Sequence, residues 1–370
     1  IDALKKIMQR HEILRSSFNF LEGVHIPFLL VRKPEEISDC LSNTELCLEF
    51  PVIIDIRKVS ETEYKISIEA LPMVLDNYSI NIIIKELIVL LTNEKNIIPL
   101  DEIIQFRAFS KWEASIIEES TSEEKTFWIG KETVINKEIF GLFSSEINSD
   151  SLSQLDKKCD AVEILELSSQ LKTTPKIILL MLLHRSISRY AGKDDFTIDS
   201  LESGRFNEEL KQTLGPLSRL FPVYLSTEKI TDFKIATKEI NGQLDDAINW
   251  NDYYYDTTNP LLKKEKSQFI FEYYDYSDLV SGEENISIGS FYYNNVSNSE
   301  LKLQVYLLKD VFYTILSYPK NAKNLGLMTF IWEDFINRIK APQTPILHVN
   351  QLDLEKLEET NGYISEARSP

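Results

Sequence analysis

The sequence predicts a layered α/β (α+β) protein, because two kinds of apolar pattern alternate along it. Short segments in which every second residue is apolar are typical of half-buried strands, and longer segments with apolar residues at helical spacing are typical of amphipathic helices. Both kinds occur in both halves of the chain. The 370 residues, 43% of them apolar, are enough for one large core or two medium ones. We therefore expect two lobes, each with helices packed on strands.

The first half begins with a helical stripe of apolar residues and then turns to strands. Arg10–Phe18 marks the change from helix to extended chain. The clearest strand is Tyr64–Ala70, which ends at Leu71 and Pro72, and from Asn77 the period becomes helical again. The pattern predicts helices at 1–9, 77–91, 106–119 and 123–131, and strands at 26–31, 52–56 and 64–70.

A polar stretch at 136–158 is expected to separate the two lobes. The best-marked helix of the second half follows Thr174 and Pro175, which fit an N-cap and a first-turn position, and it ends before Gly192. In this half we predict helices at 177–190, 233–248 and 327–339, and strands at 196–198, 222–225, 268–274 and 301–306. The predicted division is an N-terminal lobe at 1–140, a C-terminal lobe at 141–348 and a linker toward a following domain at 349–370.

Charge and cysteine content argue against several classes of partner. A net charge of -18, from 58 acidic and 40 basic side chains, would repel a phosphate backbone, so we expect no nucleic acid. Cys40, Cys47 and Cys159 show no metal-ligand spacing, which predicts no metal site and a cytoplasmic location. The most apolar stretch, 80–91, is too short to span a bilayer, so no membrane association is expected. Because the chain opens inside a predicted helix without a methionine, we expect a piece of a longer protein.

Several segments, in the right order, resemble the signature motifs of one family. Arg10–Phe18 (RHEILRSSF) is similar to RHExLRTxF, Phe127 and Trp128 to a YW element, and Tyr190–Phe196 (YAGKDDF) to RYxGxxDF. Ser203–Arg205 and Leu214–Leu217 (LGPL) follow in the same order. These motifs belong to the condensation domains of non-ribosomal peptide synthetases, which have the chloramphenicol-acetyltransferase-like fold. The resemblance covers nearly the whole chain.

The resemblance implies two similar lobes in a V with a central tunnel. The tunnel would receive the phosphopantetheine arms of peptidyl or acyl carrier proteins as visiting groups, while the domain itself binds no cofactor. In the family, an amine on one arm attacks a thioester on the other to form a peptide bond. Pro345–Tyr363 resembles the leader into a downstream adenylation domain, so neighbouring synthetase domains are expected partners. The family's opening strand, ahead of the first helix, is absent from this sequence.

The family's catalytic motif, HHxxxDG, corresponds by its place between strand and helix to the segment Leu71–Asn77. Leu71 and Pro72 stand where the two histidines would be, Asp76 keeps the aspartate, and Asn77 replaces the glycine. Proline cannot accept or donate a hydrogen bond through its side chain, and general base assistance is worth on the order of 10² to 10⁴ in rate. The resemblance therefore implies a degenerate active site to which no catalytic residue is assigned.

Asp76 is the best-matched acidic residue of this segment. In the family its counterpart pairs with an arginine, which implies a structural salt bridge with Arg15 or Arg205 rather than a catalytic carboxylate, and Arg15 is the first choice. The asparagine at 77 is expected to reshape the turn, because glycine accepts positive φ more readily. Ser218 and Arg219 stand where the family has Val-Asn, which puts that part of the motif in doubt.

The chain has only four histidines that could replace the missing base: His11, His25, His184 and His348. His11 lies in a motif whose role in the family is structural, and His184 lies inside an apolar predicted helix, so a structural role is the simpler interpretation of both.

Two functions follow from the resemblance. One is a condensation-like domain, impaired or inactive in peptide-bond formation, that acts as a scaffold for carrier proteins or recruits a tailoring enzyme. The alternative is an active acyltransferase that joins a carrier-bound thioester and an amine without the usual histidine, by holding them together. An acyltransferase-fold protein outside peptide synthesis is a weaker third reading, because of the adenylation-domain leader.

Overall fold

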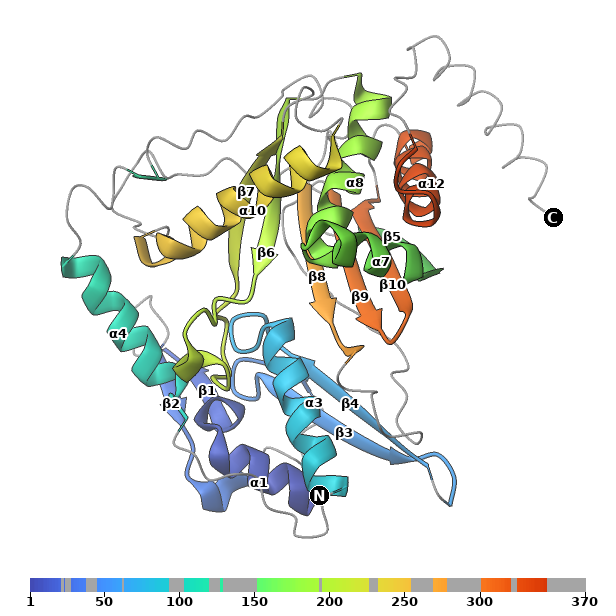
Figure 1. Ribbon diagram of the computed structural model, residues 1–370. Coiled ribbons are helices and arrows are strands. Elements are labelled where there is room, and N and C mark those ends of the chain that lie inside the picture. The colour runs from blue at the N-terminus through green and yellow to red at the C-terminus, as the bar shows by residue number, and fades with distance from the viewer. Residues whose placement is uncertain are drawn as a thin grey trace. The chain divides into compact units, whose positions relative to one another are not determined.

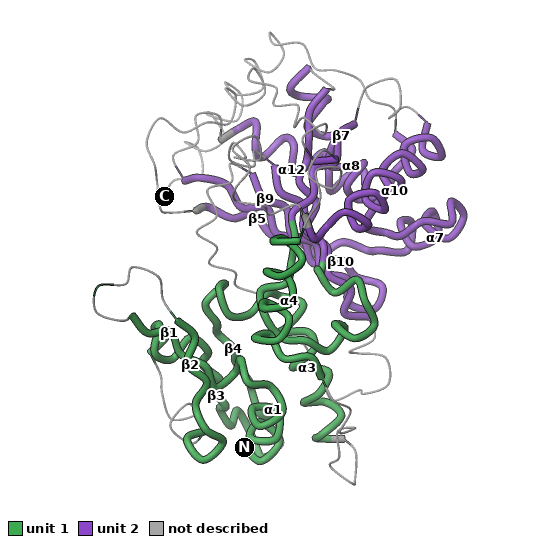
Figure 2. Tube along the Cα trace, turned by 90° about the vertical axis from the view of Figure 1, so that its left-hand side faces the viewer, with its two compact units in different colours: residues 1–119, 203–219 green, residues 120–202, 220–370 purple. Residues whose placement is uncertain are grey.

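The computed structural model describes residues 1–20, 23, 28–37, 45–61, 63–92, 103–119, 127–128, 152–192, 195–225, 232–253, 269–277, 301–320 and 325–344. Two compact units make up the chain (Figure 2). Unit 1 is Ile1–Glu119 with Ser203–Arg219, and unit 2 is Ser120–Glu202 with Leu220–Pro370. Residues 203–219, called the crossing segment below, fall within the predicted range 141–348 and pack in unit 1. The predicted boundary at 140 lies outside the described residues and stays a prediction.

Unit 1 contains two antiparallel strand pairs and two long helices (Figure 1). Its elements are α1 (Asp2–Arg10), η1 (Glu12–Arg15), β1 (Ser16–Asn19), β2 (Phe28–Val31), η2 (Pro34–Glu36), β3 (Val52–Lys58), β4 (Tyr64–Ala70), α3 (Asn77–Thr92) and α4 (Phe106–Glu119). β1 pairs with β2, and β3 pairs with β4 in the register Val52 to Ala70. The predicted helices and strands of residues 1–119 are found, with ends shifted by a few residues.

The core of unit 1 joins α1, α3 and the strand pairs. Leu4 and Ile7 of α1 meet Ile83 and Leu87 of α3, and all four are at most 5% exposed. Burial of such side chains stabilises a fold by roughly 1.5 to 3 kcal/mol each. Because α3 follows β4 after a short loop, this packing fixes both ends of the loop Leu71–Asn77, which the resemblance aligns with the catalytic motif of the family.

Unit 2 is built on a six-stranded sheet with the strand order β5-β10-β9-β8-β6-β7. Its strands are β5 (Leu152–Asp160), β6 (Phe196–Glu202), β7 (Arg219–Leu225), β8 (Phe269–Asp275), β9 (Leu301–Leu308) and β10 (Val311–Pro319). Its described helices are α7 (Val162–Leu171), α8 (Pro175–Ala191), α10 (Phe233–Asn249) and α12 (Leu325–Lys340), with the short 3₁₀ helix η4 (Asn251–Tyr253). The 3₁₀ helix η3 (Glu208–Leu210) lies in the crossing segment and so belongs to unit 1. Figure 1 shows these four helices in front of the strands.

Three elements of unit 2 differ from the sequence prediction. β5 begins inside the polar stretch that was expected to separate the lobes, and α7 and β10 were not predicted at all. β5 lies at the edge of the sheet, where most of its side chains remain exposed, so its sequence does not show the apolar alternation of a buried strand.

The central strands of unit 2 carry buried charges. All eight residues of β9 are buried. Glu272 of β8 accepts hydrogen bonds from Tyr274 Oη at 3.0 Å and Gln304 Nε2 at 2.7 Å, and its Oε1 lies 3.7 Å from Lys302 Nζ. Burial lowers the pKa of Lys302 below its ordinary value of 10.5, and the neighbouring Glu272 opposes that effect.

We expect the stability of the chain to rise with pH through the titration of Lys302. Its pKa is lower in the folded state than the ordinary 10.5, so between the two values the unfolded state binds more protons, and the free energy of unfolding increases with pH. The slope is at most about 1.4 kcal/mol per pH unit for one proton. Urea unfolding between pH 7 and 10 should show the slope in the wild type, and a Lys302→Met/Glu272→Gln variant should lack this contribution. Lys58→Met, which removes a half-exposed lysine, is the control that should keep it.

Two further properties concern sites and membranes. Within the described ranges, no group of three His, Cys, Asp or Glu side chains is arranged to hold a metal ion. No helix in the part of the chain that the structure describes is both long enough and apolar enough to cross a bilayer.

Candidate functional site

The loop from Leu71 to Asn77 connects β4 to α3 in unit 1. Leu71 extends the strand pair, because its N–H donates to Pro51 O at 2.9 Å. Val74 N–H then donates to Leu71 O at 2.9 Å, which closes a turn with Pro72 at its second position. Proline suits this position because its fixed φ matches the turn, so Pro72 shapes the loop without breaking a strand hydrogen bond.

The side chains of this loop differ in their exposure. Pro72 and Met73 are exposed, Leu71 is half-buried against the unit 1 core, and Val74 and Leu75 are at most 3% exposed. Val74 and Leu75 therefore anchor the loop. Leu71 and Pro72, which the resemblance aligns with the two histidines of the family, carry an aliphatic chain and a pyrrolidine ring. Neither group can transfer a proton.

Asp76 is the centre of a dense hydrogen-bond network. Its Oδ1 accepts from Ser79 N at 2.8 Å, lies 2.8 Å from Ser79 Oγ, and accepts from Arg205 Nη2 at 3.1 Å. Its Oδ2 accepts from Arg205 Nη1 at 2.9 Å, from the N–H groups of Leu217 and Ser218 at 3.0 Å, and from Ser218 Oγ at 2.7 Å. The residue is 7% exposed. A carboxylate engaged by so many donors holds the chain together and has no free lone pair for a substrate proton.

Arg205 is the arginine that pairs with Asp76. Its Nε donates to Thr213 O at 2.9 Å and its Nη1 also donates to Ser203 O at 2.8 Å. Arg205 therefore links two distant parts of the crossing segment through their backbone carbonyls. The first choice from sequence, Arg15, is wrong as the partner: its Nε donates to Met8 O at 3.2 Å and its Nη1 to Arg32 O at 2.6 Å. Arg15 therefore satisfies one backbone carbonyl near the end of α1 and one just after β2, whereas Arg205 fixes the crossing segment to α3.

Ser79 and two glycines complete this network. The glycines lie in the motif segments Ser203–Arg205 and Leu214–Leu217, whereas no sequence signal pointed to Ser79. The Ser79 hydroxyl accepts from Gly215 N at 3.0 Å and from Arg205 Nη2 at 2.8 Å, and Ser79 is fully buried. Gly204 has a φ of +68°, and a Cβ there would lie 1.8 Å from Leu217 O. A Cβ on Gly215 would lie 2.4 Å from the Phe106 ring. Gly204 is therefore required by the close approach of the Leu217 backbone, and Gly215 by the close approach of the Phe106 side chain.

The departures from the family motif have local structural roles. Asn77 is the first residue of α3 and is not among the described residues with positive φ, so the position does not require glycine here. Ser218 supplies an additional hydroxyl donor to Asp76, and Arg219 forms an ion pair with Glu113 of α4. At Asn77, where a reshaped turn was expected, the structure shows the regular start of α3.

The histidines with a described environment are engaged in structural contacts. His11 Nε2 lies 2.9 Å from Glu86 Oε2, and Arg10 Nε donates to the other oxygen of Glu86 at 3.1 Å. Glu86 is further along α3, about 15 Å from Asp76 at a rise of about 1.5 Å per residue, so His11 is remote from the motif loop. His184, fully buried in α8, stacks on Phe196 with ring centroids 4.0 Å apart. His25 and His348 lie outside the described residues.

The largest part of the chain matches a known family model. Residues 46–322 match the model described as the condensation domain. The chain belongs to the condensation-domain family. Bacitracin synthase 3 of Bacillus licheniformis is 24% identical over 302 residues, which are 70% of this chain and 5% of that synthase. The chain therefore spans a small fraction of the length of this curated relative.

Solved structures share the fold of this condensation domain at low sequence identity. The condensation domain from the Monacolin K polyketide synthase MokA has a TM-score of 0.72 and 15% identity, over 94% of this chain and 89% of that chain. The X-domain in its complex with OxyB from teicoplanin biosynthesis has a TM-score of 0.62 and 16% identity, over 94% of this chain and 88% of that chain. These similarities show the chloramphenicol-acetyltransferase-like fold that the resemblance implied.

The YW element of this condensation domain anchors unit 2. Trp128 Nε1 donates to Trp250 O at 2.8 Å, and its ring stacks on Phe221 at 5.8 Å between centroids. Phe127 stacks on Trp250 at 5.3 Å. Of the predicted helix at 123–131, only residues 127–128 are described, and they are helical.

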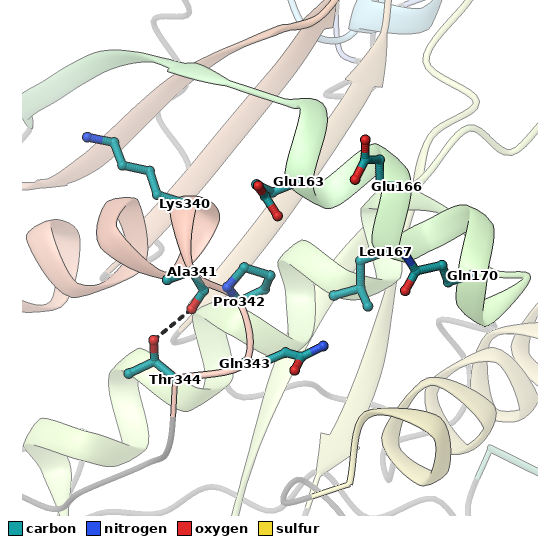
Figure 3. Close-up of a pocket in the computed structure, with 9 residues that line it drawn as sticks. All are labelled: Glu163, Glu166, Leu167, Gln170, Lys340, Ala341, Pro342, Gln343 and Thr344. Atoms are coloured by element: carbon teal, nitrogen blue, oxygen red, sulfur yellow. Dashed lines mark hydrogen bonds between the residues drawn. The ribbon is translucent and has the colours of Figure 1, made fainter.

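Unit 2 has a cavity of about 420 Å³ between α7 and the turn that follows α12 (Figure 3). Glu163, Glu166 and Gln170 line it from α7, and Lys340 and Gln343 line it from the other side. It contains none of the motif residues Leu71, Pro72, Asp76 or Asn77, which lie in unit 1, so it is not the site that the family motif marks.

Proposed function

We propose that this condensation-family chain is a non-catalytic domain of a non-ribosomal peptide synthetase, which serves as a scaffold for carrier proteins or recruits a tailoring enzyme. The observation that carries the proposal is the chemistry of the motif loop. The two histidine positions are Leu71 and Pro72, and the remaining acidic residue, Asp76, is fully engaged with Arg205 and the crossing segment.

The loss of a base at Pro72 removes the proton transfer that a histidine would perform. Such assistance is typically worth about 10² to 10⁴ in rate. The network of Asp76, Ser79 and Arg205 is nevertheless fully formed, with every distance between 2.7 and 3.2 Å. The loop is thus fully ordered by hydrogen bonds although it carries no group that can act as a base. This combination supports a function that depends on the folded surface of the domain and not on catalysis.

Two of the comparisons support the partners of this proposal. The curated relative is a synthase of which the matched part is 5%, so neighbouring synthetase domains, including an adenylation domain downstream, are proposed partners. One solved structure is a complex of the X-domain and OxyB from teicoplanin biosynthesis, which supports a recruited tailoring enzyme as a proposed partner of this chain. The phosphopantetheine arms of carrier proteins are the proposed visiting groups. The proposed location is cytoplasmic.

Carrier-protein binding tests the scaffold role directly. We expect the purified chain to bind its donor or acceptor carrier protein, loaded with phosphopantetheine, with a dissociation constant near the micromolar range that is typical of weak, transient complexes. Fluorescence anisotropy with a labelled carrier protein measures it. Pro72→Ala should bind equally well, because the side chain at this position is not required for docking. If neither carrier protein binds at concentrations up to about 1 mM, the carrier-scaffold role is ruled out. Recruitment of a tailoring enzyme is then the part of the proposal that a search for binding partners must test.

A further inference from the structure

Two helices of unit 2 bring three arginines and one carboxylate together. Arg185 and Arg189 lie one turn apart on α8, and Asp334 and Arg338 lie one turn apart on α12. α8 and α12 pack against each other (Figure 1). These four residues are called the arginine seam below.

The one carboxylate of the arginine seam is shared by two arginines. Asp334 Oδ1 accepts from Arg189 Nη1 at 2.5 Å, and Asp334 Oδ2 accepts from Arg338 Nε at 2.6 Å. Arg338 Nη1 also donates to Thr344 O at 2.9 Å. The side chains of Asp334 and Arg338 are 6% and 2% exposed, so this bridge is almost fully removed from water. One negative charge therefore compensates two buried or half-buried guanidinium groups.

A third guanidinium adds to the positive charge of the seam. Arg185 is 3% exposed, and its guanidinium lies over the Phe233 ring at 4.2 Å. Its pKa is lowered to about 10, first because burial disfavours the charged form and then because of the positive charge of Arg338. The positive charge of Arg338 thus adds to the cost of charging the buried Arg185 guanidinium.

The seam also has donors without an acceptor. Arg189 Nε and Arg338 Nη2 are buried, and neither has a hydrogen-bond partner in the part of the chain that the structure describes. A buried donor that lacks an acceptor loses its hydration without replacement, and the loss is larger for a charged group. An anion bound at these two N–H groups would supply the acceptors that they lack.

We propose that the arginine seam binds an oxyanion of the phosphate class, with Arg189 at the entrance and Arg338 behind it. Guanidinium groups bind phosphate and carboxylate oxygens through paired N–H donors. The Arg189 side chain is 31% exposed, which makes it the part of the seam that a ligand can reach. The opposite end is closed by the turn at Thr344, and the cavity beyond it carries Glu163 and Glu166, which repel an anion. This inference does not depend on the proposed scaffold function.

Inorganic phosphate is the probe for this site. Isothermal titration of phosphate into the 370-residue chain, with sodium chloride adjusted to keep ionic strength constant, is expected to give saturable binding in about the millimolar range or tighter. Arg189→Met should weaken binding at least tenfold, and Arg189→Lys should weaken it less, because lysine keeps the charge but loses the planar fork. Lys340→Met, which changes a cation that lines the neighbouring cavity, should leave binding unchanged.

The proposal is overturned if the wild-type chain shows no saturable binding, or if Arg189→Met and the wild type bind phosphate equally. Circular dichroism of each variant without phosphate establishes that it is folded. Should Arg189→Met fail to fold, Arg189→Gln provides the same comparison with a side chain that retains hydrogen-bond donors. Equal weakening by Lys340→Met would also contradict the site, because it would show that binding follows surface charge in general.

Discussion

Replacement of Asp76 by alanine is expected to destabilise the folded chain by about 3 to 5 kcal/mol, because it leaves Arg205 as an uncompensated charge in the interior. The Asp76 and Arg205 side chains are 8% and 4% exposed. The substitution also removes acceptors for the N–H groups of Leu217 and Ser218, so the crossing segment loses its attachment to the start of α3. Urea-induced unfolding of the purified chain, followed by circular dichroism, measures the change.

A surface ion pair provides the matched control for this substitution. Asp55 and Arg57 form an ion pair at 2.5 Å with side chains 40% and 78% exposed, so Asp55→Ala should cost between about 0 and 1 kcal/mol. The double variant Asp76→Ala/Arg205→Met should be more stable than the sum of the two single changes predicts, because no unpaired charge remains buried. If Asp76→Ala costs no more than Asp55→Ala, the network around Asp76 does not hold the crossing segment.

Replacement of Gly204 by alanine is expected to lower the free energy of unfolding by about as much as Asp76→Ala does, but through a steric clash. The added Cβ would lie 1.8 Å from Leu217 O, and the φ of +68° is unfavourable for any residue with a side chain. Together, overpacking and the left-handed conformation should cost about 2 to 5 kcal/mol. Thermal unfolding of the purified chain checks this.

Replacement of Gly242 by alanine should instead raise the free energy of unfolding. Gly242 lies inside α10, and a Cβ there meets no atom within 4 Å. Gly242→Ala should therefore stabilise the chain by up to about 1 kcal/mol through helix propensity. A Gly204→Ala variant as stable as Gly242→Ala would contradict the close contact between the two turns of the crossing segment.

The sequence predicts those helices and strands that pack one apolar face against a core, because their apolar residues then recur at a regular spacing. In β4 the alternation predicted the strand, and Ile68 and Ala70 at its end pack against the core of unit 1, although Tyr64 and Ile66 are exposed. α3 is predicted well because its apolar face packs in the same core. The prediction missed β5, whose mostly exposed side chains give no apolar signal, and β10, which follows β9 after a two-residue turn. Edge strands and closely spaced strands are set by their neighbours in space, which the local pattern does not record.

The candidate site shows the same limit. The motif order was enough to locate Leu71, Pro72 and Asp76, because each stands at a fixed place between β4 and α3. The choice between Arg15 and Arg205 depended on which distant segment returns to α3. Only the structure shows that the crossing segment packs in unit 1 and brings Arg205 with it. Ser79 was not singled out because a buried serine in the first turn of a helix has no distinctive sequence pattern.

The proposed loss of catalysis can be tested by following amide formation. The purified chain is mixed with its loaded donor and acceptor carrier proteins, and the products are followed by intact-protein mass spectrometry. A no-domain reaction sets the background, a condensation domain with both motif histidines is the positive control, and a Pro72→His variant shows whether one imidazole is enough for activity. We predict that the unaltered chain forms amide no faster than the no-domain reaction. Amide formation clearly above that background would contradict the scaffold function and would show that this chain condenses its substrates without a histidine.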